Sequence, residues 1–179
     1  MKASALMLAW LALAASPAFA ADPSFQLTAT AKDFANYFPG QLANGYFSTT
    51  TAPRGTEGNL AYMVAFMDYT KDDIARPAAI PGWTEIDYSA GQSDAGPFWM
   101  NQVDISPAVF QDYRQTLDLR DATLTTRYRY LDHGKTTAIE VTTFVSQASA
   151  HLAATRLTIT PDFDGEVELS FALNTWAPH

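Results

Sequence analysis

Paired carboxylates are the first chemistry that this sequence could support. Cleaving a glycosidic bond requires one carboxyl that protonates the leaving oxygen and a second on the far side of the sugar, about 5–10 Å away. Asp118 and Asp121 flank a turn, where we expect contact with solvent or with Arg120 and Arg127, and Glu140 alternates out of an apolar strand face. The other candidates are Glu57, Asp68, Glu85 and Asp87. No two of these residues are nominated as a catalytic pair by the sequence.

The histidines lack the spacing of a metal site. His133, His151 and His179 form neither the i,i+4 nor the His-x-His pair that places two imidazoles on one ion. The sequence also lacks an Asp-x-Asp-x-Asp-Gly calcium loop, a Gly-x-Ser-x-Gly nucleophile elbow and a glycine-rich phosphate loop. It contains no cysteine, which excludes a thiolate nucleophile and a disulfide framework. We therefore expect no catalytic residue, metal or cofactor in this chain.

Aromatic side chains are a feature that fits a sugar-binding surface. The chain contains four tryptophans and eight tyrosines. Sugars present patches of C–H bonds that lie well on aromatic faces, while their hydroxyls exchange hydrogen bonds with Asn, Asp and Arg. Core packing is the alternative, because aromatic rings also bury large areas. Both interpretations stay open for Trp83 and Trp99.

The second half of the chain predicts an antiparallel sheet. Four segments alternate between apolar and polar residues, as strands with one packed and one wet face require. In the last of them we expect one packed face made by Val167, Leu169, Phe171 and Leu173. The four segments are Leu124–Leu131, Thr136–Val145, Leu152–Thr160 and Glu166–Leu173.

The first half predicts further strands between turn-rich loops. Residues 71–82 and 89–97 are expected to be irregular, and a short helical turn is expected from Ser106 to Tyr113. Strands separated by turn signals at this spacing favour an all-β antiparallel sandwich over a βαβ fold. The additional strands are an edge strand around Phe25–Ala29, then Gly45–Thr51, an apolar central strand at Leu60–Tyr69, Trp83–Tyr88 and Gln115–Arg120.

The N-terminus resembles a signal peptide. Met1-Lys2 is a short basic start, Ala5–Ala15 is apolar but too short to cross a bilayer, and Ala18-Phe19-Ala20 fits a cleavage site. We expect cleavage after Ala20, which leaves one domain over residues 21–179 without a membrane span. The alanine-rich leader and the lack of cysteine favour a bacterial protein in the periplasm or outside the cell.

The charge excludes one class of partner. The formal net charge is -8 at pH 7, and no basic stripe appears. Nucleic acids and anionic membranes select basic surfaces, so neither is an expected partner.

The order of motifs resembles the N-terminal β-sandwich domain of glycoside hydrolase family 65, which contains acid trehalases, α-glucosidases and disaccharide phosphorylases. The similarity runs from about Asn44 to Leu173. The motifs that carry it are Asn44-Gly45-Tyr46, the Arg54-Gly55 loop, Ile80-Pro81-Gly82-Trp83, the block Leu117–Thr125, Phe144-Val145-Ser146 and His151–Ala154.

The resemblance implies a galactose-mutarotase-like antiparallel sandwich (a supersandwich) that precedes an (α/α)6 catalytic barrel. The family's general acid lies in that barrel, so no catalytic residue is carried over. Asn44, Tyr46, Arg54 and Trp83 are the expected carbohydrate-facing or interdomain-facing residues. The family's Gly-x-Arg-Gly is replaced here by the longer segment Ser48–Gly55, which departs from the pattern.

Three functions follow as hypotheses. The chain is the front part of an exported glycosidase acting on trehalose or another α-glucoside, a free-standing carbohydrate-binding sandwich, or a structural domain. Export favours a hydrolase over a phosphorylase, because a sugar phosphate is useful only inside the cell. The C-terminal segment Asn174–His179 directly follows a strand, which we interpret as an element that continues in a longer protein.

Overall fold

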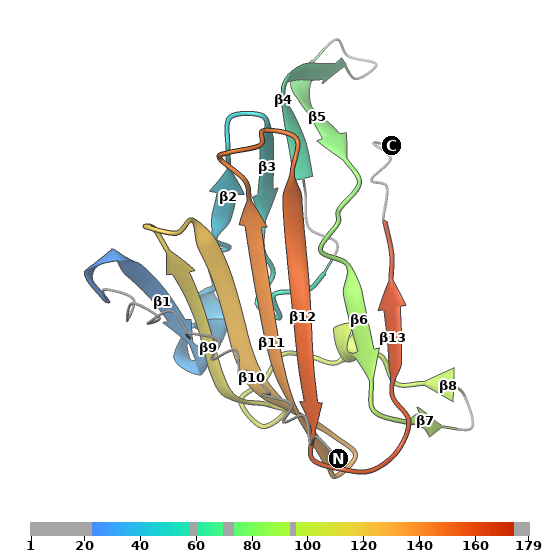
Figure 1. The fold of residues 1–179 in the computed structure, drawn as a ribbon. Helices are drawn as coiled ribbons and strands as arrows, with labels where there is room; N and C mark the ends of the chain where they lie inside the picture. The colour runs from blue at the N-terminus through green and yellow to red at the C-terminus, as the bar shows by residue number, and fades with distance from the viewer. Residues whose placement is uncertain (1–22, 58–60, 70–73, 94–95, 174–179) are drawn as a thin grey trace, which may run out of the picture.

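The structure is a computed structural model that describes residues 23–57, 61–69, 74–93 and 96–173. Its largest element is a five-stranded antiparallel sheet in the order β1-β9-β10-β11-β12 (Figure 1). The strands are β1 (Gln26–Thr30), β9 (Phe110–Asp118), β10 (Thr123–Asp132), β11 (Lys135–Val145) and β12 (Ala153–Pro161). The all-β antiparallel sandwich is thus confirmed, and the predicted signal peptide lies outside the described residues.

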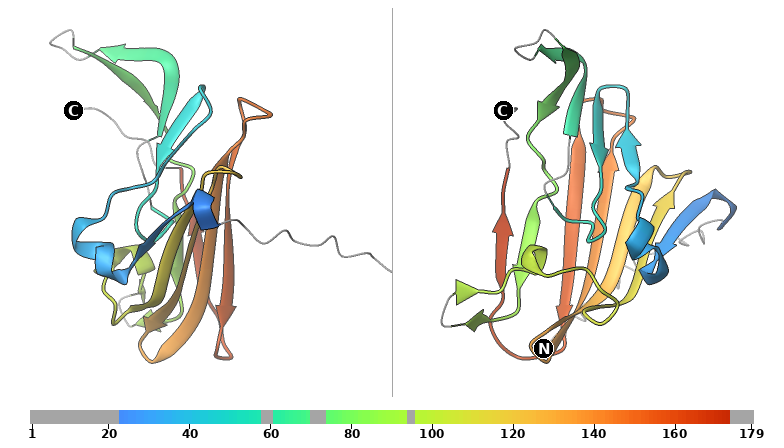
Figure 2. Two further views of the ribbon diagram at one scale, coloured as in Figure 1. Left: turned by 90° about the vertical axis from the view of Figure 1, so that its left-hand side faces the viewer. Right: turned by 180° about the vertical axis from the view of Figure 1, so that it is seen from behind.

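The second layer is assembled from shorter pieces. A four-stranded sheet has the order β2-β3-β4-β5, and two further strand pairs are β6-β13 and β7-β8. The left view of Figure 2 shows the cyan and green part of the chain, which contains β2 to β5, on one side of the five-stranded sheet. The strands are β2 (Gln41–Ala43), β3 (Phe47–Thr50), β4 (Ala61–Tyr69), β5 (Ala75–Ile80), β6 (Ile86–Ser89), β7 (Gln92–Ser93), β8 (Gly96–Pro97) and β13 (Glu168–Phe171).

The described residues also form three short 3-10 helices: η1 (Pro23–Phe25) before β1, η2 (Ala31–Asn36) after it, and η3 (Met100–Gln102) before β9. No helix within the described ranges has the length and hydrophobicity that a membrane span requires. The expected helical turn from Ser106 is wrong over its second half, because β9 already begins at Phe110 and carries that residue into the core.

The core lies between the two layers. Alternation along β10 and β11 sends Tyr128, Tyr130, Ile139 and Val141 inward, where Tyr88 of β6 and Met100 of η3 cover them. A second cluster joins Leu42 of β2 to Leu124 and Val145. Burial of such side chains stabilises a fold by roughly 1.5–3 kcal/mol each. The predicted inward face of β11, including Ile139, Val141 and Val145, is confirmed.

The prediction that the last alternating segment buries an apolar face is wrong for three of its four residues. Leu169, Phe171 and Leu173 are exposed, whereas Val167 packs against the core. The strand itself pairs with β6. β4 departs in the same way: it lies inside its sheet, between β3 and β5, yet Val64, Phe66, Met67 and Tyr69 are exposed. β4 and β5 project beyond the five-stranded sheet at the top of Figure 1.

β5 forms where the sequence predicted irregular chain. Its two prolines, one inside at Pro77 and one directly after at Pro81, argued against a strand. Pro77 pairs opposite Met67 in the edge strand of the β2–β5 sheet. An edge strand tolerates proline because half of its N–H groups are not needed for the ladder.

Candidate functional site

A segment of the second layer is fixed on the inner face of the large sheet. Four consecutive carbonyls, from Thr51 to Arg54, each accept a hydrogen bond from a side chain. The donors are Tyr37 Oη (2.9 Å to Thr51 O), Gln115 Nε2 (3.1 Å to Ala52 O), Tyr113 Oη (2.7 Å to Pro53 O) and Tyr128 Oη (3.2 Å to Arg54 O). Burial raises the pKa of Tyr113 and of Tyr128, which keeps both hydroxyls protonated as donors.

Gly55 allows the segment to lie this close to the sheet. Its φ is +77°, and a Cβ atom there would lie 2.7 Å from Thr126 Oγ1 and 3.1 Å from Val141 Cβ. Only glycine combines a left-handed backbone with such a close approach. Gly55 is therefore required by the backbone geometry of the segment.

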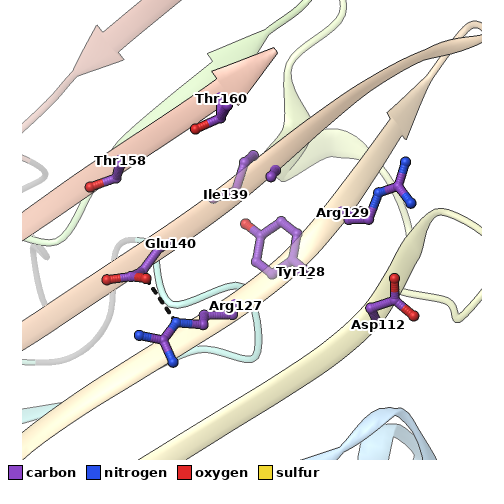
Figure 3. A pocket seen from close by; sticks show the side chains of 9 residues that line it. Asp112, Arg127, Tyr128, Arg129, Ile139, Glu140, Thr158 and Thr160 are labelled. Atoms are coloured by element: carbon purple, nitrogen blue, oxygen red, sulfur yellow. Dashed lines mark hydrogen bonds and ion pairs between the residues drawn. The ribbon is translucent and has the colours of Figure 1, made fainter. Parts of the chain in front are cut away.

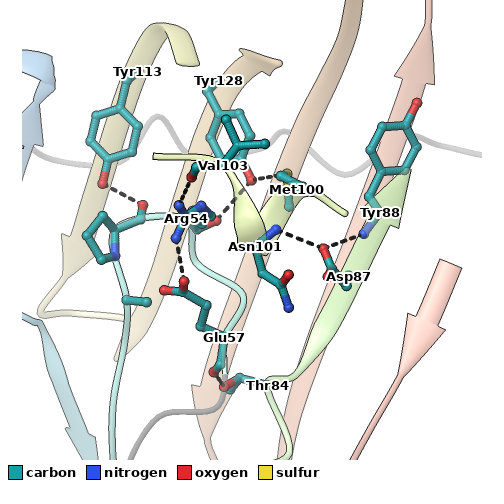
Figure 4. Close-up of polar contacts among 12 residues, drawn as sticks. Arg54, Glu57, Thr84, Asp87, Tyr88, Met100, Asn101, Val103, Tyr113 and Tyr128 are labelled. Atoms are coloured by element: carbon teal, nitrogen blue, oxygen red, sulfur yellow. Dashed lines mark hydrogen bonds and ion pairs between the residues drawn. The ribbon is translucent and has the colours of Figure 1, made fainter. Parts of the chain in front are cut away.

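Arg54 points inward from this segment (Figure 4). Its Nη1 forms an ion pair with Glu57 Oε1, and its Nη2 donates to the carbonyl of Val103. The guanidinium carbon lies 5.4 Å from the centroid of the Phe110 ring, a cation–π contact. Arg54 is only 8% exposed, so its charge is neutralised by contacts within the fold.

The charges of two more carboxylates, Glu85 and Asp87, act on Glu57 in this ion pair. Burial raises the pKa of Glu57; the Arg54 charge opposes the shift, and the Glu85 and Asp87 charges add to it. Burial also raises the pKa of Asp87, although the backbone N–H groups of Tyr88 and Asn101 donate to its Oδ1 at 2.9 and 3.1 Å. We call Arg54, Glu57, Glu85 and Asp87 the polar cluster.

The polar cluster is linked to the chain before β6 by a hydrogen bond from a side chain to a backbone carbonyl. Thr84 Oγ1 donates to the Glu57 carbonyl at 2.7 Å, which places the chain before β6 beside the Arg54 segment. Three buried side-chain atoms form no hydrogen bond within the described residues. All three lie on the Arg54 segment or on the chain before β6: Arg54 Nε, Trp83 Nε1 and Glu85 Oε2. Buried polar atoms without a partner are rare in folded proteins.

Acid–base chemistry is a poor match for this arrangement. Asp87 is buried and holds two backbone N–H groups, and Glu57 is held by Arg54. Carboxyls held inside the fold in this way cannot flank a sugar from two sides as glycoside cleavage requires. Among the described residues, no group of three or more His, Asp or Glu is arranged to hold a metal ion.

Asn44, the first predicted site residue, clamps a turn to the large sheet. Its Oδ1 accepts from the backbone N–H groups of Tyr46 (2.9 Å) and Phe47 (2.8 Å). Its Nδ2 donates to the carbonyls of Ser146 (2.6 Å) and Ala150 (3.0 Å) in the loop between β11 and β12. All of these contacts are internal to the domain.

Tyr46 and Trp83 belong to the same aromatic group. Tyr46 packs edge-on against His151 (4.4 Å between centroids) and against Phe47 (4.8 Å). Phe47 then contacts Trp83 at 6.1 Å. Trp83 is half-buried beside the Leu42, Leu124 and Val145 cluster.

The structure therefore brings three of the four predicted residues together through Phe47 and places Arg54 in the separate polar cluster. Their carbohydrate-facing role stays a prediction. In the sequence, Glu57, Glu85 and Asp87 stand out only as isolated acidic candidates. Neither His151 nor Val103 can be recognised there as a partner of Tyr46 or Arg54. A backbone carbonyl such as that of Val103 leaves no signal in the sequence.

Comparison with known proteins identifies the family. The model for the N-terminal domain of glycosyl hydrolase family 65 matches residues 32–177. A search of curated proteins gives no match. A solved structure, "Putative kojibiose phosphorylase from human microbiome", is similar in fold with a TM-score of 0.66 and 14% sequence identity. The match covers 89% of this chain and 23% of that chain, so this chain spans about a quarter of the length of that protein.

The matched range contains residues 51–55 (the Arg54 segment), the polar cluster, and Asn44 with its hydrogen-bond partners. It also contains all strands of the large sheet except β1. The motifs that carried the resemblance therefore lie inside the family match, and the resemblance is confirmed. This chain belongs to glycosyl hydrolase family 65, of which it carries the N-terminal domain.

Proposed function

We propose that this chain is the carbohydrate-associated N-terminal domain of an exported glycoside hydrolase that acts on trehalose or another α-glucoside. The family match over residues 32–177 carries the proposal. The chain corresponds to 23% of the similar solved chain, and we place the general acid in an (α/α)6 barrel within the remaining part of such a protein.

The inward direction of the polar cluster supports a scaffold role. The Arg54 segment is held by four side-chain hydrogen bonds to its carbonyls, and Arg54 and Asp87 are buried. Side chains that are buried and held by the fold in this way position a domain and its neighbours rather than transform a substrate. The exposed apolar side chains of β4 and β13 suit a contact with a further domain, because large exposed apolar patches mark interaction sites.

Activity assays test the scaffold role. The purified chain, incubated with trehalose, maltose or kojibiose with and without inorganic phosphate, should release neither glucose nor glucose phosphate. Adding a family 65 barrel domain should restore turnover or raise its thermal stability. Hydrolysis by the chain alone that disappears in Glu57→Gln or Asp87→Asn would contradict the proposal and place catalysis in the polar cluster.

Export is tested separately. Expression of the full chain in a Gram-negative host should yield a periplasmic protein whose N-terminal residue is Ala21. A cytoplasmic protein that retains residues 1–20 would remove the argument for hydrolysis over phosphorolysis. Hydrolysis is preferred only because a sugar phosphate released outside the cell has no use, and the family membership would stand.

A free-standing carbohydrate-binding sandwich is the second candidate. It is favoured by a hollow on the outer face of the large sheet that carries both charges and hydroxyls. Binding of a sugar by the purified chain without any turnover, and without any gain from an added barrel domain, would select this candidate.

A further inference from the structure

The outer face of the five-stranded sheet contains a hollow that the candidate site does not use. Its volume is about 330 Å³, at the low end of the range of roughly 300–1,000 Å³ that small-molecule pockets occupy. It opens on the face opposite the core, across β9 to β12 (Figure 3). The lining residues are Asp112, Arg127, Tyr128, Arg129, Ala138, Ile139, Glu140, Thr158 and Thr160.

A small residue among longer ones creates the hollow. In the strand register Ala138 lies between Arg129 on β10 and Thr160 on β12. One step along the same face, Glu140 lies between Arg127 and Thr158. Ala138 is exposed and contributes only a methyl group, so the longer side chains around it form walls above an apolar floor.

A β-bulge supplies the last wall. The register between β9 and β10 shifts between Arg127 and Arg129, so that Asp112 and Tyr113 both lie opposite Tyr128. Asp112 adopts a φ of +52° and is exposed, whereas Tyr113 is buried. Bulges redirect side chains in this way and are frequent beside functional sites. The Asp112 carboxylate thus faces the same side of the sheet as Arg129, as Figure 3 shows.

The charges in the hollow nearly balance. Arg127 Nε donates to Glu140 Oε2 at 2.8 Å, and Arg156 Nη2 lies 3.7 Å from the other Glu140 oxygen. Arg129 and Asp112 add one charge of each sign at the other end. Two guanidinium groups and two carboxylates among the lining residues favour neither an anion nor a cation. They do favour groups that donate and accept hydrogen bonds, as do the Thr158 and Thr160 hydroxyls.

We propose that the hollow around Ala138 binds a neutral sugar ring. A sugar combines an apolar C–H face, which fits the methyl floor, with hydroxyls that donate to Glu140 and Asp112 and accept from Arg129 and the threonines. The site is open and offers no aromatic ring among its exposed lining residues, so we expect a dissociation constant on the order of 1 mM. The choice of α-glucosides as first probes rests on the proposed function.

NMR titration of the purified full chain tests the proposal. Glucose, maltose, trehalose and kojibiose are added in turn, and amide shifts should appear in β10, β11 and β12 around Ala138. Ala138→Leu fills the hollow and should weaken binding about tenfold, because the added side chain clashes with the bound ring. Ala75→Leu, the same substitution at an exposed position of β5, should leave binding unchanged.

Glu140→Gln provides a second variant that keeps the side-chain shape. It should weaken binding while the thermal unfolding transition stays cooperative. Equal binding in wild type and Ala138→Leu, or shifts that map outside β9–β12, would overturn the site. Galactose and xylose are titrated in the same way, and if they bind at Ala138 while the α-glucosides do not, the site stands and only the choice of α-glucosides as its ligands fails. No binding by any sugar tested overturns the site and leaves the proposed function untouched.

Discussion

Individual side chains in this domain serve mainly to hold backbone in place. Asn44 uses both ends of its amide to join a turn to the loop between β11 and β12, and Arg54 joins its own segment to the carbonyl of Val103. Neutral hydrogen bonds of this kind contribute about 1 kcal/mol each, and those to charged groups more. Asn44 and Arg54 therefore have a structural explanation in this chain.

At Trp83, the contributions of the ring and of the N–H group to the free energy of unfolding can be measured separately. Its Nε1 is buried without a hydrogen-bond partner among the described residues, while its ring packs near Phe47. Trp83→Phe removes the unpaired donor and keeps most of the ring, so the free energy of unfolding should change by less than about 1 kcal/mol. Trp83→Ala should cost about 3 kcal/mol. Urea unfolding of both variants checks this, and equal losses would show that the N–H group is bonded.

Glu57 should give the domain a distinctive pH dependence. Burial raises its folded-state pKa above the ordinary value of 4.5, so its stabilising contribution is complete below that pH and is lost as pH rises through the folded-state pKa. Glu57→Gln has no such titration, and its free energy of unfolding should fall less between about pH 4.5 and neutrality than that of wild type. Asp87 acts in the same direction and remains in the variant.

Asp118 supplies the control of opposite sign. Backbone N–H groups of Asp121 and Arg120 and the Gln26 amide hydrogen-bond to its carboxylate and lower its pKa below 3.8. Its contribution is present above pH 3.8 and is lost as pH falls through the folded-state pKa, so Asp118→Asn should change only the acid end of the curve. Identical curves of unfolding free energy against pH for wild type and Glu57→Gln would show that the fold does not raise the pKa of Glu57.

At the scale of elements, the sequence predicted strands well wherever alternation and burial agree. β10, β11 and β12 were predicted within one residue of their bounds, because each of them alternates over nine or more residues. β13 was found, but its apolar face was wrongly placed in the core. Alternation specifies two faces and cannot say which neighbour covers one of them.

The candidate site could be predicted only in part. Asn44-Gly45 and Arg54-Gly55 were visible as turn motifs, whereas the partners that fix them, at residues 103 and 146–151, lie about 50 and 100 positions further along the chain. The hollow at Ala138 depends on the residues across β9 to β12 and on the bulge at Asp112. Neither register nor bulge position can be deduced from periodicity within one strand.

Replacing Gly45 and replacing Gly55 should lower the free energy of unfolding by different amounts. Gly45 (φ +84°) has nothing within 4 Å of its virtual Cβ, so Gly45→Ala should cost only the left-handed backbone penalty of about 1 kcal/mol. Gly55→Ala adds a contact of 2.7 Å with Thr126, and the total should reach about 3 kcal/mol or more. Chemical denaturation measures both. Equal losses would mean that the Arg54 segment moves away from the sheet without cost.

At the scale of the whole molecule, exposed apolar side chains should cause association. Phe66 and Met67 on β4 and Phe171 on β13 are more than half exposed. Phe66→Ser combined with Phe171→Ser should shift sedimentation at micromolar concentration toward monomer and keep the unfolding transition. Leu119→Ser, at an exposed apolar position in the β9–β10 turn, should have no such effect. A monomeric wild type at all concentrations would contradict this.

The pairing of strands from distant parts of the chain has a kinetic consequence. β1 pairs with β9, with Gln26 opposite Asp118, and β6 pairs with β13, with Phe171 opposite Ile86. The β9–β12 meander needs only short connections and can form early, whereas both outer pairs must close long loops. Folding dominated by such non-local pairing takes roughly milliseconds to seconds. During synthesis β6 therefore stays unpaired until β13 has been made. In a nascent chain that ends before residue 168, β6 lacks the strand with which it forms its backbone hydrogen bonds.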